Sequence, residues 1–156
     1  MQSILIATDG SPGSDAAVAD GIELAREAGA KVTVVSVRPP IALLGEPYHH
    51  RKLSEQLQAA RAAVDRAMAA AADDGVGAEA EILEGEVAKE VLRLARSRNV
   101  DLIVIGSRGL GAVTGVLLGS VSRAVVRDAD RPVLVVKEPT RTKEASTSAE
   151  RVVSAP

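Results

Sequence analysis

Short runs of aliphatic and β-branched residues recur along the chain, and between them apolar residues repeat every three or four positions. A short apolar run predicts a buried strand, whereas the longer spacing predicts an amphipathic helix. This pattern predicts strands at residues 3–7, 31–37, 79–83, 102–105 and 132–137. It predicts helices at residues 12–28, from 53 to about 75, at 86–98, and in a segment with Leu117, Val121, Ala124 and Val125 on one face.

Strands and helices alternate through residues 1–138, which predicts an α/β domain with a parallel sheet, right-handed crossovers and helices on both faces. The strand at 79–83 is half polar, so we expect it near an edge of the sheet. Ligands of such sheets bind outside the carboxyl ends of the strands. Residues 7–10, 37–39 and 106–111 are therefore expected on one rim.

Two segments do not follow the alternation of strands and helices. Residues 38–50 contain three prolines and a glycine, which predicts an irregular loop, either a mobile lid or a disordered connection. Residues 139–156 are polar and low in aliphatic side chains. We expect them to form a solvated, disordered tail after the domain.

Composition narrows the class of protein. The chain has 156 residues, 46% of them hydrophobic, no cysteine, and Tyr48 as its one aromatic residue, which favours a single globular domain without disulfides. No apolar run approaches the roughly 18 residues of a membrane helix, and no basic segment precedes the first strand. With a net charge of −2 and no basic stripe or aromatic platform, neither a nucleic acid nor a membrane is an expected partner. We expect a cytoplasmic location.

Five glycines lie within fourteen residues after the strand at 102–105: Gly106, Gly109, Gly111, Gly115 and Gly119. Glycines between a buried strand and a helix allow backbone N–H groups to approach a phosphate closely. The segment lacks the lysine of a P-loop, and its glycine spacing after the fourth strand disfavours a Rossmann dinucleotide site. A phospho-receiver domain is also disfavoured, because the third strand carries no acidic cluster with an aspartate.

The spacing Gly106-x2-Gly109-x9-Gly119-Ser120 resembles the signature of the ATP-binding branch of the universal stress protein family. The resemblance spans residues 2–137 and includes the Thr8-Asp9-Gly10-Ser11 run and the RPVLVV run that ends at Val136. It implies an adenine nucleotide alpha hydrolase-like, three-layer fold with strand order 3-2-1-4-5. It also implies a homodimer in which the strand at 132–137 pairs antiparallel with its two-fold mate.

The resemblance implies ATP as the ligand, with Mg²⁺ or Mn²⁺ held mainly by the phosphates. Asp9 is a natural acceptor for ribose hydroxyls, and Gly119 and Ser120 lie where the start of a helix favours an anion. By the resemblance, the main chain near Val37 holds the adenine edge. The candidate binding residues are Ala7, Thr8, Asp9, Val37, Ile105, Gly106, Arg108, Gly109, Gly111, Gly119, Ser120, Val121 and Ser122.

Several of these residues also have a purely structural interpretation. Asp9 can support the Ser11 helix cap, Arg108 can face solvent, and the serines at 120 and 122 can be ordinary helix-start residues. The adjacent pair His49-His50 lacks a third ligand nearby, so we predict no protein metal site.

Three other functions stay open at this stage. The protein can be a slow ATPase or autokinase that uses Ser107, Ser120 or Ser122, a binder of AMP or cyclic AMP, or a ligand-free dimeric interaction module. We identify no general base and no nucleophile with a partner near the proposed site, so we assign no catalytic residue.

Overall fold

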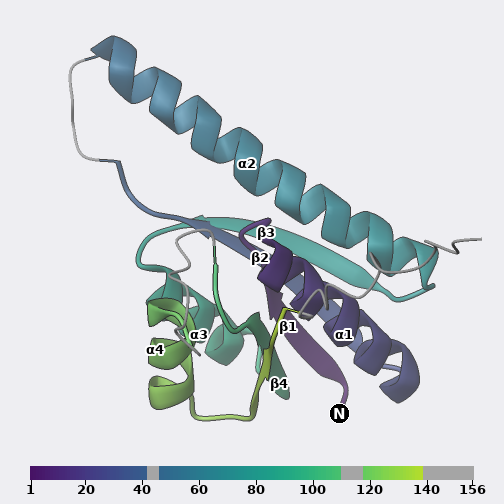
Figure 1. Ribbon diagram of the computed structural model, residues 1–156. Helices are drawn as coiled ribbons and strands as arrows, with labels where there is room; N and C mark the ends of the chain where they lie inside the picture. The colour runs from purple at the N-terminus through teal and green to yellow at the C-terminus, as the bar shows by residue number, and fades with distance from the viewer. Residues whose placement is uncertain (42–45, 110–117, 139–156) are drawn as a thin grey trace, which may run out of the picture.

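The computed structural model describes residues 1–41, 46–109 and 118–138 (Figure 1). Its strands are β1 (Ser3–Ala7), β2 (Lys31–Arg38), β3 (Ala78–Glu84), β4 (Leu102–Gly106) and β5 (Val133–Val136). Its helices are α1 (Pro12–Ala28), α2 (Glu46–Asp73), α3 (Val87–Ser97) and α4 (Ser120–Asp128). The strands form one sheet in the order β3-β2-β1-β4-β5, and every neighbouring pair is parallel, so the predicted topology is confirmed.

The central strand β1 supplies both halves of the hydrophobic core. Ile4 and Ile6 face α1 and α2, whereas Leu5 and Ala7 face α3 and α4. Consecutive strand residues point to opposite faces, so an unbroken aliphatic run is what a strand covered on both sides requires. The resulting three layers can be followed in Figure 1, where α2 lies on the opposite side of the sheet from α3 and α4.

Helix α1 begins and ends at the predicted residues. The Ser11 side chain accepts a hydrogen bond from the N–H of Ser14 at 3.2 Å, and Pro12 occupies the first helical position. Gly29 ends the helix with φ at 63°. The β1–α1 loop is residues 8–11, between the end of β1 and the start of α1. The N-terminal cap therefore fixes the direction of the chain as it passes from this loop into α1.

Helix α2 begins at Glu46, so the predicted start near 53 and the predicted irregular loop through residue 50 are wrong. Pro47 is tolerated here because the first N–H groups of a helix have no intrahelical partner. The apolar pattern missed these turns because no residue from 47 to 59 is buried, and the first buried residue of the helix is Ala60. The rest of the expected lid, at 42–45, and the expected tail at 139–156 lie outside the described residues.

Helix α4 begins at Ser120, with Gly119 as the residue that precedes it rather than in its first turn. Among the described residues, no helix is long and apolar enough to cross a membrane.

Arg131 lies near the amino end of β4, opposite the cavity. It donates hydrogen bonds to the carbonyl groups of Ala95 and Val100 at 2.7 and 2.8 Å. Arg131 therefore connects the segment before β5 to the end of α3 and to the turn between α3 and β4.

The start of α1 lies directly against the end of β4. A Cβ atom at Gly106 would lie 2.7 Å from the carbonyl oxygen of Gly13, and one at Gly13 would lie 2.8 Å from the carbonyl oxygen of Arg108. Both distances are shorter than a van der Waals contact, and backbone atoms cannot rotate aside as a flexible side chain can. Glycine at these two positions is therefore required by the fold itself.

We expect Gly106→Ala to lower the free energy of unfolding by about 1–3 kcal/mol, because the α1 and β4 backbones must separate. Urea titration followed by circular dichroism measures this change. The matched control is Gly77→Ala, since no atom lies within 4 Å of a Cβ at Gly77. Equal stability of the two variants would show that the α1–β4 contact adapts without cost.

Candidate functional site

A cavity of about 460 Å³ opens at the carboxyl ends of β1, β2 and β4, on the side of the sheet that carries α3 and α4. Every predicted binding residue except Gly111 lines this cavity. Gly111 lies outside the described residues. Sequence reasoning missed six further lining residues, which are Ser14, Val35, Val87, Val91, Leu118 and Arg123.

One part of the cavity is apolar. It is lined by Val35 and Val37 from β2, Val87 and Val91 from α3, and Ile105 from β4. Ligand pockets commonly combine such aliphatic walls with a few polar groups that fix the orientation of the ligand. The α3 valines were missed because the rule that places ligands at strand ends does not say which helix covers the rim. Their helical spacing predicted only that they point inward.

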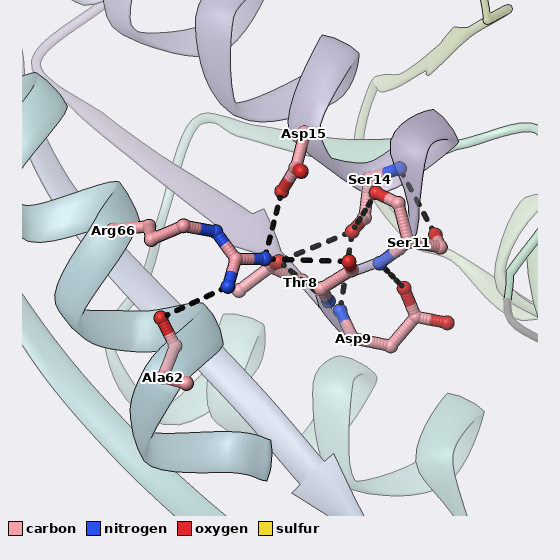
Figure 2. A network of polar contacts seen from close by, with 8 residues as sticks. Thr8, Asp9, Ser11, Ser14, Asp15, Ala62 and Arg66 are labelled. Carbon is pink, nitrogen blue, oxygen red and sulfur yellow. Dashed lines mark hydrogen bonds and ion pairs between the residues drawn. The ribbon is translucent and has the colours of Figure 1, made fainter.

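The β1–α1 loop borders the polar part of the cavity and is held by a network of hydroxyl groups (Figure 2). Ser14 Oγ donates to the Ser11 carbonyl oxygen at 2.9 Å and lies 3.2 Å from Thr8 Oγ1. Because a serine has a single hydroxyl proton, Thr8 is the donor in its contact with Ser14. Thr8 Oγ1 in turn accepts from the N–H of Gly10 at 3.2 Å. The hydroxyl groups therefore fix the backbone on both sides of Asp9.

The two carboxylate oxygens of Asp9 have different surroundings. Oδ1 accepts from the N–H of Ser11 at 2.9 Å, so the structural interpretation of this residue is correct for one oxygen. Oδ2 lies beside Gly109, where an added Cβ would collide with it. Both residues line the cavity. Glycine at position 109 thus makes room for the Asp9 carboxylate.

A second helix approaches the loop from outside the cavity. Arg66 of α2 donates to the carbonyl oxygen of Gly10 at 3.3 Å and lies 3.4 Å from Asp15 Oδ1, as Figure 2 shows. Both charged side chains are about half exposed, so the ion pair contributes little to stability. Its effect is to fix where the β1–α1 loop lies relative to α2.

The start of α4 presents backbone donors to the cavity. The first N–H of this helix with an intrahelical acceptor is that of Arg123, which donates to the Gly119 carbonyl oxygen at 3.0 Å. The N–H groups of Ser120, Val121 and Ser122 precede it, all three residues line the cavity, and the N-cap residue, Gly119, has no side chain with which to cap them. Such N–H groups together with the helix dipole favour an anion.

Ser122 is one of the candidate binding residues, but its hydroxyl makes its hydrogen bond to the protein backbone. Its hydroxyl donates to the Ser107 carbonyl oxygen at 2.8 Å, and its side chain is buried. The Gly119 N–H donates to the same carbonyl oxygen at 2.7 Å. The single proton of the Ser122 hydroxyl is therefore directed into the protein, and this residue fixes the start of α4 against the end of β4.

The described lining residues include one carboxylate, Asp9, two arginines and no histidine. His49 and His50 lie in α2, and no group of three or more potential metal ligands occurs in the described part of the chain. The described part of the cavity thus combines an apolar wall, a carboxylate and a cluster of backbone N–H groups.

We expect Ser14→Ala to lower the free energy of unfolding by about 1–3 kcal/mol, because the buried Thr8 hydroxyl would lose its acceptor. Chemical denaturation of the two proteins measures the difference. Ser54→Ala is the control, since Ser54 is exposed in α2 and its loss should change stability by less than about 0.5 kcal/mol. A Ser14→Ala variant as stable as the control would show that the hydroxyl network is dispensable.

Comparisons with known proteins agree with this arrangement. The profile of the universal stress protein family matches residues 1–137. A universal stress protein of Thermus aquaticus is 40% identical over 138 residues, which cover 88% of this chain and 99% of that protein. The universal stress protein YxiE of Bacillus subtilis is 32% identical, with 88% and 99% of the two chains covered.

Two solved structures are similar in backbone as well. A universal stress protein family member from Burkholderia pseudomallei superposes with a TM-score of 0.73 at 28% identity, covering 86% of this chain and 95% of its own. A universal stress protein in complex with cAMP superposes with a TM-score of 0.68 at 28% identity, covering 88% and 97%.

Proposed function

Because the chain belongs to the universal stress protein family, we propose that its cavity binds ATP and that the protein is a nucleotide-dependent stress-response or signalling module. The observation that carries this proposal is the start of α4, where three N–H groups of cavity-lining residues lack intrahelical acceptors and the N-cap residue is a glycine, which cannot cap them. Since ATP is an intracellular nucleotide, the proposal includes a cytoplasmic location.

The chemistry of the lining residues supports the following arrangement of the nucleotide in the cavity. The adenine ring fits the aliphatic wall formed by β2, α3 and Ile105. The ribose hydroxyls fit the Asp9 carboxylate, which the Ser11 N–H orients through its other oxygen. The phosphates fit the N–H groups at the start of α4.

A divalent cation, Mg²⁺ or Mn²⁺, would accompany the triphosphate. The described residues contain no cluster of three or more potential metal ligands, so the cation would be held mainly by phosphate oxygens. Mg²⁺ is commonly bound in this way, with few protein ligands and several waters. The cation would neutralise phosphate charge, and the protein residues would orient the nucleotide.

A second candidate ligand is a nucleotide with one phosphate, AMP or cyclic AMP. The observation that favours it is the solved relative in complex with cAMP, which has 28% identity to this chain. Backbone N–H groups can bind one phosphate whether or not further phosphates follow it. Denaturing the purified protein and identifying the released nucleotide by mass spectrometry distinguishes these ligands.

We expect Gly119→Glu to abolish ATP binding without unfolding the protein. A Cβ at Gly119 meets its nearest atom at 3.5 Å, an ordinary contact, so the backbone there accepts a residue with a side chain. Its carboxylate would stand beside the phosphate position and repel like charge. Isothermal titration calorimetry measures binding, and circular dichroism checks the fold.

The control is Gly77→Glu, which adds the same charge at an exposed glycine away from the cavity. It should bind ATP as wild type does. ATP binding by a folded Gly119→Glu variant with wild-type affinity would show that the phosphates lie elsewhere, and a ligand-free interaction module would then be favoured.

The assembly proposed with this function is a homodimer through β5. This edge strand is aliphatic along its length, and its first three residues are only partly buried. The other edge, β3, carries Glu79 and Glu81, which pair with Arg98. Charged edges resist strand pairing, whereas an uncharged aliphatic edge favours it.

We expect Val135→Pro to produce monomers. The carbonyl oxygen of Pro132 accepts from the N–H of Ile103 in β4, and that of Val136 accepts from the N–H of Ser107 directly after β4. Backbone groups alternate in direction along a strand, so the Val135 N–H points away from β4. Proline therefore removes an outward donor and spares the β4–β5 pairing. Light scattering after gel filtration measures the mass. Val135→Thr keeps the N–H and should stay dimeric, and a dimeric proline variant would place the interface on another surface.

A further inference from the structure

The cations on the α3 and α4 side of the molecule fall into two groups. Most of them pair with carboxylates, in the pairs Lys89–Glu86, Arg93–Glu90, Arg98–Glu79, Arg98–Glu81, Arg127–Asp128, Arg96–Asp130 and Arg131–Asp130. Arg108 and Arg123 differ. Both line the cavity, and neither has a carboxylate within ion-pair distance in the described part of the chain. The positive charge at this end of the cavity is therefore not neutralised as it is elsewhere on this face.

Arg123 is held at the start of its own helix. It belongs to the first turns of α4, and its Nη2 donates to the Leu118 carbonyl oxygen at 3.2 Å, one residue before the Gly119 cap. This hydrogen bond directs the guanidinium back toward the N–H groups of Ser120 to Ser122. The residue thereby adds a full positive charge to the end of the helix that already carries the positive pole of the dipole.

A cation in this position is unfavourable unless an anion accompanies it. Helices α1 and α3 follow the usual preference, with Asp15 and Glu90 in their first turns. The first turn of α4 has no acidic residue. The one carboxylate among the described lining residues, Asp9, accepts a backbone hydrogen bond in the β1–α1 loop. Because no carboxylate of the described residues balances Arg108 and Arg123, we infer that an anionic group of the ligand does so.

The amount of charge available exceeds what one phosphate requires. Three backbone N–H groups already match the oxygens of a single phosphate, which carries a charge of about −2. Each guanidinium adds up to five further donors, in a fork that suits phosphate oxygens. These donors remain for additional phosphates of the same ligand.

We propose that Arg123, together with Arg108, makes the site select adenine nucleotides by their number of phosphates, favouring ATP and ADP over AMP and cyclic AMP. This inference rests on the proposed nucleotide binding and specifies it further. Arg123 is the better residue to test, because it is exposed and its described side-chain hydrogen bond is to Leu118. The Arg108 backbone, in contrast, belongs to the tight contact between α1 and β4.

The experiment compares the affinities of ATP, ADP and AMP by isothermal titration calorimetry at two salt concentrations. We expect Arg123→Gln to weaken ATP binding about tenfold, the loss of roughly one charge-assisted hydrogen bond, and to change AMP binding less than about twofold. Arg123→Lys should recover part of the ATP affinity, since it restores the charge but not the fork. The ATP affinity of wild type should fall more steeply with salt than that of Arg123→Gln.

The control is Arg127→Gln on the same helix, because Arg127 pairs with Asp128 and does not line the cavity. It should leave all three affinities unchanged. An equal loss of ATP and AMP affinity in Arg123→Gln would overturn the inference and give the residue a structural role, and unchanged affinities would overturn it as well. Wild-type protein that binds none of the three nucleotides would instead overturn the proposed function from which the inference proceeds.

Discussion

The cavity depends on one contact, in which the backbone of α1 meets the backbone at the end of β4 with no side chain between them. Gly13 and Gly106 make this approach possible. It brings the β1–α1 loop beside the segment after β4, so that Asp9 lies against Gly109. Because β1 and β4 pair as neighbours in the sheet, the loops that follow them start side by side, and this backbone contact lets the two loops pack closely around one cavity.

The three glycines of the sequence motif differ in what surrounds them. Gly106 makes room for the α1 backbone, and Gly109 makes room for the Asp9 carboxylate. At Gly119, in contrast, an added Cβ atom would make only ordinary contacts with the protein. The spacing G-x2-G-x9-G therefore combines two requirements of the fold with one position where the protein alone does not demand glycine.

Much of the architecture could be predicted from the sequence because the signals were local. Helix α1 begins after Ser11, at Pro12, and ends before Gly29, as predicted, and the aliphatic runs of β1 and β4 predicted these two strands. Contacts between distant elements had no such signal. The α3 valines reach the cavity only through packing, and the direction of the Ser122 hydroxyl depends on the Ser107 carbonyl oxygen. The start of α2 was missed because its first turns have no buried face.

The two edge strands of the sheet differ in how readily they can pair with a strand of another chain. A sheet in which both edge strands can pair in this way can add chains indefinitely and form filaments. Here the Glu79, Glu81 and Arg98 charges mark β3 as the non-adhesive edge, while β5 is uncharged from Val133 to Val136. Association through β5 would place a β3 strand at each outer boundary. Such an assembly would be closed at two chains, and the same charges would protect it from further polymerisation.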